Sequence, residues 1–187
     1  MRCAVCDQDH PLDSPAFLHP DAVRSMKPSV RRKTVKQDSN TCVVTVGSES
    51  RYFVCGLLYV AFNEDPTKTI AWSIWVEVNQ QGYDAVVTAW SPSLLEAMEE
   101  EEAAAAQFPI VPGKLANHIP GYLETVGLPV MLESDGCISA PEILLEDSDH
   151  PFVAECLGPV SIHRLLDWIA VAPPRDERLG ERPEFSK

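Results

Sequence analysis

The sequence lacks any long hydrophobic run, and this absence argues against a membrane-spanning protein. No stretch approaches the roughly 18 consecutive apolar residues that cross a bilayer. The amino terminus also lacks the apolar region of a signal peptide. We therefore expect a soluble protein located in the cytoplasm. The chain has 187 residues, 45% of them hydrophobic, which suits one globular domain with a substantial core.

Basic residues are scarce. The chain has 15 Lys and Arg residues against 28 Asp and Glu residues, and its formal net charge is −13. The acidic excess lies in residues 61–187, whereas residues 1–60 are slightly basic. So acidic a surface repels phosphate backbones, which argues against nucleic-acid binding. It favours solubility, and it would attract a basic protein partner.

Catalytic motifs are missing as well. The chain contains no Gly-x-Ser-x-Gly nucleophile elbow, phosphate-binding loop, dinucleotide fingerprint or His-Glu-x-x-His. The best catalytic candidate is His150, because Asp147 and Asp149 are close enough in the sequence to orient its ring. The alternative role is structural. His150 precedes Pro151 at a turn, where its ring would hydrogen-bond a backbone carbonyl or Asp149, and we favour this alternative.

Of the six cysteines, Cys3 and Cys6 are the two that lie close together. Without an export signal we do not expect a disulfide framework. The Cys-x-x-Cys spacing brings two thiolates within reach of one tetrahedral ion, and His10 is placed to add a nitrogen ligand. We therefore predict a zinc knuckle over residues 1–13. The fourth ligand would be Cys42, His19 or water. Two free thiols or a redox pair are the alternatives.

A sheet is predicted between residues 41 and 90. Residues 70–78 alternate along the chain with a period of two and are β-branched and aromatic, which is typical of a half-buried strand. Short polar turns separate this strand from neighbours that would pair with it as an antiparallel meander. The neighbouring strands are residues 41–46, 52–62 and 83–90. Gly56 indicates a bulge or a close approach. Trp75 either packs under a helix or lines a site.

The segments on either side of this sheet are less regular. Residues 14–40 form a basic segment that we expect to be flexible, apart from one helical turn near residues 21–26. Residues 91–107 are rich in Glu and Ala and predict an exposed helix. Further predicted elements are short helices at 114–119 and 121–126, strands at 128–133 and 142–146, and a final amphipathic helix at 159–172. Residues 173–187 are predicted to be a disordered tail.

Several short motifs follow one another in a characteristic order over residues 3–172. They are Cys3-x-x-Cys6 with His10, Cys42, Tyr52-Phe-Val, Trp72-Ser-Ile-Trp-Val, Gly113-Lys-Leu-Ala-Asn, Pro120-Gly-Tyr122, Ile143-Leu-Leu-Glu146, Ser148-Asp-His-Pro151 and the helix at 158–170. In order and spacing the chain resembles the bacterial domain-of-unknown-function family 2199. It departs at Asp7, where members commonly have Gly, which fits a tight turn best. The resemblance implies a common fold and a metal-site candidate. It implies no activity, because the family is uncharacterised.

Together these patterns predict an α+β fold, with one domain over residues 1–172. It would have a mainly antiparallel sheet of five to seven strands, helices packed on one face and the amino-terminal metal knuckle. Our first functional hypothesis is a non-enzymatic acidic binding protein, in concrete form an immunity protein that neutralises a bacterial toxin. The predicted partner surface consists of Glu99, Glu100, Glu101, Glu102, Asp147, Asp149 and Trp75. The second hypothesis is a small zinc-dependent enzyme, and a metal- or redox-sensing role is the third. The oligomeric state stays open.

Overall fold

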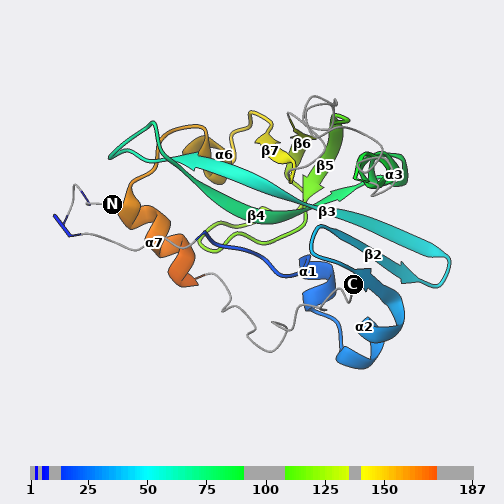
Figure 1. The fold of residues 1–187 in the computed structure, drawn as a ribbon. Helices are drawn as coiled ribbons and strands as arrows, with labels where there is room; N and C mark the ends of the chain where they lie inside the picture. Colours follow the sequence, from blue (N-terminus) through cyan, green and yellow to red (C-terminus); the bar gives the residue numbers. More distant parts are fainter. Residues whose placement is uncertain (1–2, 4–5, 9–13, 91–107, 135–139, 172–187) are drawn as a thin grey trace, which may run out of the picture.

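The computed structural model describes residues 3, 6–8, 14–90, 108–134 and 140–171 (Figure 1). A seven-stranded sheet runs in the order β1 to β7. Its strands are β1 (Val35–Gln37), β2 (Thr41–Val46), β3 (Glu49–Ala61), β4 (Thr69–Val78), β5 (Val111–Leu115), β6 (Pro129–Glu133) and β7 (Glu142–Leu145). The helices are α1 (Asp21–Arg24), α2 (Pro28–Thr34), α3 (Gln80–Ala89), α6 (Pro151–Cys156) and α7 (Ile162–Val171).

The long hairpin of β3 and β4 is the central element of the fold (Figure 1). Each strand pairs antiparallel with its sequence neighbour, from β1 through to β7. The predicted antiparallel pairing is therefore confirmed for the strands at residues 41–46, 52–62 and 70–78. β4 is buried on both faces, with Trp72 and Trp75 each 1% exposed although they point to opposite sides. An aromatic column continues from Phe17 to Trp72 and on to Trp168, with ring centroids 5.8 and 5.7 Å apart.

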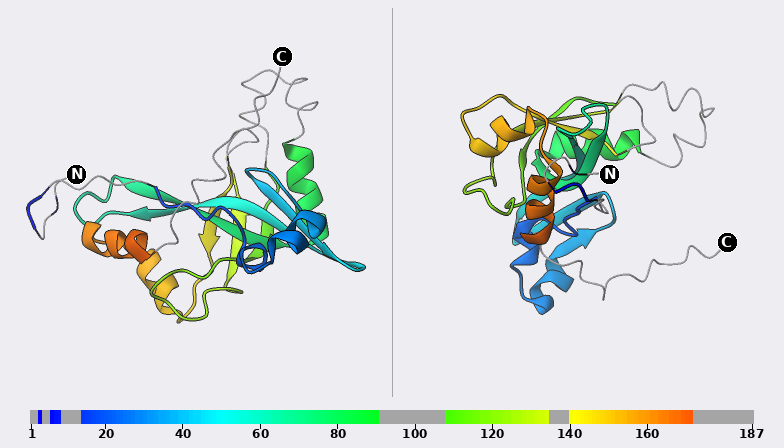
Figure 2. Two further views of the ribbon diagram at one scale, coloured as in Figure 1. Left: turned by 90° about the horizontal axis from the view of Figure 1, so that it is seen from below. Right: turned by 90° about the vertical axis from the view of Figure 1, so that its left-hand side faces the viewer.

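The sheet closes on itself into a barrel-like ring. β7 pairs with β6 and also, in parallel, with β3 at Leu57 and Glu142. Gly56 lies at this closure, where an added Cβ would come within 2.7 Å of Ile143 Cγ1. The predicted close approach at Gly56 is therefore confirmed. We expected the helices to pack on one face of the sheet, but they do not. α6 and α7 lie toward one end of the hairpin and α3 lies toward the other (Figures 1 and 2).

The strand predicted at residues 83–90 is wrong, because these residues belong to α3. The side chain of Asn79 caps this helix by accepting a hydrogen bond from Gly82 N at 2.7 Å. Tyr83, Val86 and Trp90 then recur at intervals of three and four residues, which is helical spacing. The β-propensity of these residues favoured a strand. The Asn79 cap and the helical spacing of the apolar residues favour a helix instead, and a helix forms.

Other segments also differ from expectation. The helices predicted at 114–119 and 121–126 are wrong, because β5 ends at Leu115 and the residues that follow it, as far as β6, form turns, bends and coil. Residues 14–40, expected to be flexible, contain α1, α2 and β1, and the helical turn predicted near residues 21–26 is present as α1. The predicted helix at 91–107 and tail at 173–187 lie outside the described residues. No helix in the described part of the chain has the length and apolarity to cross a membrane.

Candidate functional site

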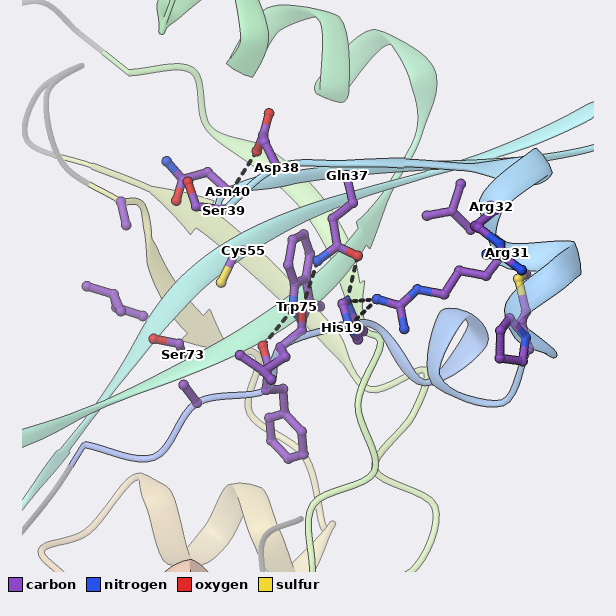
Figure 3. Close-up of a pocket in the computed structure, with 18 residues that line it drawn as sticks. His19, Arg31, Arg32, Gln37, Asp38, Ser39, Asn40, Cys55, Ser73 and Trp75 are labelled. Carbon is purple, nitrogen blue, oxygen red and sulfur yellow. Dashed lines mark hydrogen bonds between the residues drawn. The ribbon is translucent and has the colours of Figure 1, made fainter. Parts of the chain in front are cut away.

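A pocket of about 820 Å³ lies where the amino-terminal segment and α2 pass over β3 and β4 (Figure 3). Phe17, Leu57 and Trp75 contribute to its apolar wall. Trp75 is fixed there because its indole N–H donates to the carbonyl oxygen of Phe17 at 2.8 Å. Its backbone N–H donates to the side chain of Asn117, also at 2.8 Å. Of the two roles predicted for Trp75, lining a site is the one found. Trp75 is 1% exposed, and its role in binding a protein partner stays a prediction.

The polar wall of the pocket is a chain of hydrogen bonds through His19, Gln37 and Arg31. His19 Nδ1 lies 2.8 Å from Gln37 Oε1, and Gln37 Nε2 donates to the carbonyl oxygen of Leu18 at 2.7 Å. The guanidinium of Arg31 donates to the other ring nitrogen, His19 Nε2. The same Nη2 atom of Arg31 also lies 3.2 Å from His19 Nδ1, so the guanidinium contacts both ring nitrogens. The ring therefore holds the charged end of Arg31 in place at the pocket (Figure 3).

The charges around the pocket favour an anion. Arg31 and Arg32 both line it. Asp38 also lines it, but its carboxylate accepts hydrogen bonds from the backbone N–H groups of Asn40 and Thr41, at 2.8 and 2.6 Å. Two guanidinium groups and one carboxylate leave the lining with a net positive charge, and the carboxylate is turned toward its own backbone. The pocket therefore has a positive lining in a chain whose net charge is −13.

The thiols of Cys42, which is buried, and Cys55, which is half-buried, have low reactivity. Burial raises the pKa of Cys55, which lines the pocket, to about 12. Burial likewise raises the pKa of Cys42 to about 12, although the nearby charge of Arg31 lowers it slightly. Both thiols are therefore protonated at neutral pH, which makes them poor nucleophiles.

A second cluster brings together Cys3, Cys6 and His163. One ligand atom from each lies within 4.8 Å of the others. The structure thus joins the two predicted cysteine ligands with a histidine of α7 that the sequence analysis did not select. Predicted ligand Cys42 lies on β2, toward the other end of the hairpin, and His19 lines the pocket. Predicted ligand His10 lies outside the described residues.

His150 occupies the structural position that we favoured. It caps α6, where its Nδ1 accepts a hydrogen bond from Phe152 N at 3.2 Å. Its Nε2 lies 2.7 Å from the carbonyl oxygen of Leu123 and donates to it. Both ring nitrogens are therefore engaged with the backbone. Asp147 and Asp149 are exposed beside it, whereas Glu99, Glu100, Glu101 and Glu102 lie outside the described residues.

A polar network joins α6 and α7. Arg164 donates to Glu155 at 2.8 Å and to the hydroxyl of Tyr122 at 3.1 Å, and that hydroxyl donates to Glu155. Burial by itself would raise the pKa of Glu155. The hydrogen bonds from Arg164 and Tyr122 outweigh that effect and hold the pKa below its usual value.

These features define a class: a small α+β protein with a barrel-like closed sheet, a positively lined pocket and a separate cluster of thiols and imidazole. The chain belongs to the family described as uncharacterized proteins conserved in bacteria (DUF2199), whose model matches residues 2–157. The match confirms the resemblance inferred from the motifs. No curated protein and no solved structure matches the chain.

Proposed function

We propose that this protein is a non-enzymatic binding protein whose pocket takes a small organic anion with an apolar body. The observation that carries the proposal is Arg31, fixed by His19 at an apolar pocket of a strongly acidic chain. A carboxylate or phosphate pairs well with a guanidinium held in place in this way. The apolar body would pack against Trp75 and Leu57.

Binding fits this pocket better than catalysis does. Cys55 is protonated, Asp38 is committed to a turn, and His19 is engaged by Arg31 and Gln37. The alternative of a zinc-dependent enzyme needs a metal at the reaction site, and the thiol–imidazole cluster contributes no residue to the lining of the pocket. The toxin-neutralising form of the binding hypothesis would use the exposed carboxylates of Asp147 and Asp149, and it stays a prediction.

Calorimetric titration with 2-naphthoate and its neutral analogue 2-naphthamide tests the proposal. Both carry the same aromatic body, and only the first carries a charge. We expect naphthoate to bind more tightly than naphthamide. Arg31→Gln should weaken naphthoate binding by about 10- to 100-fold, because a hydrogen bond to a charged group contributes about 1.5–3 kcal/mol.

The matched control is Arg24→Gln, which removes an exposed guanidinium of α1 that does not line the pocket. This variant should bind naphthoate as the wild type does. Equal affinities for naphthoate and naphthamide, or equal effects of Arg31→Gln and Arg24→Gln, would overturn recognition of an anion in the pocket.

A further inference from the structure

The thiols of Cys3 and Cys6 are held together by a tight backbone turn. Asp7 N donates to the carbonyl oxygen of Cys3 at 2.9 Å, and Cys3 N donates to that of Gln8 at 2.8 Å. Asp7 adopts a left-handed conformation with φ 57°. Asp is among the few residues other than Gly that tolerate this conformation. The departure at Asp7 therefore leaves the knuckle turn intact.

The histidine of the cluster comes from a well-anchored helix. His163 is the second residue of α7, and Ile162 N just before it donates to both carboxylate oxygens of Glu64 at 3.2 Å. Further along the helix, Trp168 stacks on Trp72 of β4. The helix is thus tied to the end of the β3–β4 hairpin. Because its support does not involve the cysteines, the position of His163 is set independently of the turn at Cys3 and Cys6.

The spacing of the three ligand atoms suits zinc. A tetrahedral ion with bonds of about 2.3 Å to sulfur and about 2.0–2.1 Å to nitrogen keeps its ligand atoms about 3.5–3.8 Å apart. The observed separations, within 4.8 Å, reach this geometry with small side-chain rotations. Thiolate and imidazole are ligands that zinc prefers, whereas calcium and magnesium require oxygen.

Charge balance points the same way. Cys3 is 1% exposed, and Cys6 packs against the hydrophobic core. Two thiolates and a neutral imidazole around a divalent cation form a complex with no net charge. A zinc complex of these three ligands is therefore compatible with the position of the two sulfurs at the edge of the hydrophobic core.

From this geometry we propose that Cys3, Cys6 and His163 bind one Zn²⁺ ion, which fastens the amino-terminal turn to α7. These three protein ligands leave the fourth position of a tetrahedral ion to water. Binding displaces the protons of both thiols, and no oxidation or reduction is involved. This proposal does not depend on what the pocket binds.

Elemental analysis of tag-free protein, purified in reducing buffer and dialysed after one equivalent of Zn²⁺, tests the site. We expect about one zinc per chain in the wild type. Cys6→Ser and His163→Asn should each retain about tenfold less. The matched controls are Cys156→Ser, a half-buried thiol on α6, and His118→Asn, an exposed imidazole. Both controls should keep the wild-type zinc content.

Cobalt substitution of the wild type provides a readout that needs no variant to fold. A thiolate-to-cobalt charge-transfer band together with intense visible bands of tetrahedral Co²⁺ is the expected spectrum. Substoichiometric zinc in the wild type, a cobalt spectrum of octahedral type, or zinc retained in full by His163→Asn would each overturn the proposal. So would a Cys3–Cys6 disulfide in protein prepared with reductant, because it would assign the pair to redox chemistry.

Discussion

The two ends of the β3–β4 hairpin both carry cysteine and histidine side chains, but the environment of these side chains differs. At the end near α7, Cys3, Cys6 and His163 lie within 4.8 Å of one another. Away from this cluster, Cys42 is buried on β2 and Cys55 is half-buried at the pocket, and burial raises the pKa of each to about 12. The comparison shows that burial lowers the reactivity of an isolated thiol by raising its pKa. A pair of thiols that clusters with an imidazole is instead a candidate metal site.

Residues 14–20 precede α1 and form part of the pocket wall. Their hydrogen bonds indicate how strongly the pocket depends on the cysteine cluster. Phe17 N donates to Ser73 O and Ser73 N donates to Pro15 O, both at 3.0 Å. Asn117 Nδ2 donates to His19 O at 2.9 Å. The pocket wall is therefore attached to the sheet by its own bonds, and we expect it to persist when the metal is removed.

The largest effect on this attachment should come from Asn117→Ala. Asn117 is fully buried, and its side chain bonds Trp75, His19 and Asp21. Its loss leaves the backbone N–H of Trp75 buried without an acceptor. We expect the free energy of unfolding in urea to fall by about 3 kcal/mol. Asn63→Ala, at an exposed position, should change it by less than about 0.5 kcal/mol. Equal effects of the two variants would contradict the role of Asn117.

Gly56→Ala should disturb the ring closure on which both ends depend. Its Cβ would lie 2.7 Å from Ile143 Cγ1 and 3.1 Å from the carbonyl oxygen of Pro141. Relief of these contacts should cost about 1–3 kcal/mol, measured by urea unfolding. Gly158→Ala is the control, because its Cβ would meet nothing closer than 3.9 Å. A Gly56→Ala variant as stable as this control would argue against closure between β3 and β7.

Asn79→Ala should weaken α3 and leave both sites intact. The Asn79 side chain is the cap of this helix, and removal of such a cap costs about 1 kcal/mol. Asn79→Asp keeps an acceptor oxygen and should restore most of the loss. Thermal unfolding followed by circular dichroism measures both variants. If Asn79→Asp were as destabilised as Asn79→Ala, the capping bond would not be the cause.

The smallest effect should be the pH dependence of the Glu155 network. Its folded pKa lies below the unfolded value, so its contribution to stability is present above about pH 4.3 and is lost as pH falls through the folded pKa. Glu155→Gln should therefore lower stability by less than about 1 kcal/mol at pH 7 and converge with the wild type in acid. A difference that stays constant from pH 7 into the acid range would contradict the network.

Much of the sheet could be predicted from the sequence, because strands with one clear period carry a strong local signal. The strands at 41–46 and 128–133 and the final helix were identified in this way. β5 was missed because Pro112 and Gly113 interrupt the pattern. Yet Gly113 is where β5 comes close to Val76 of β4, with 2.4 Å from its would-be Cβ to Val76 Cγ1.

The two candidate sites could be predicted only in part from the sequence. The spacing of Cys3 and Cys6 identified a thiol pair, but His163 lies far away in the sequence, and no local pattern joins it to them. The pocket arises because residues 14–40 fold back over β3 and β4, which a basic, proline-containing segment does not reveal. The remaining signal was the count of Arg residues there, of which Arg31 and Arg32 reach the pocket.

The separateness of the two ends is tested most directly by titrating 2-naphthoate into Cys6→Ser and Arg31→Gln while measuring their zinc content. We predict that Cys6→Ser loses zinc and binds naphthoate within about twofold of the wild type. Arg31→Gln should keep its zinc and lose naphthoate affinity by about 10- to 100-fold. If loss of zinc abolished naphthoate binding, the two ends would form one coupled site and the account would be wrong.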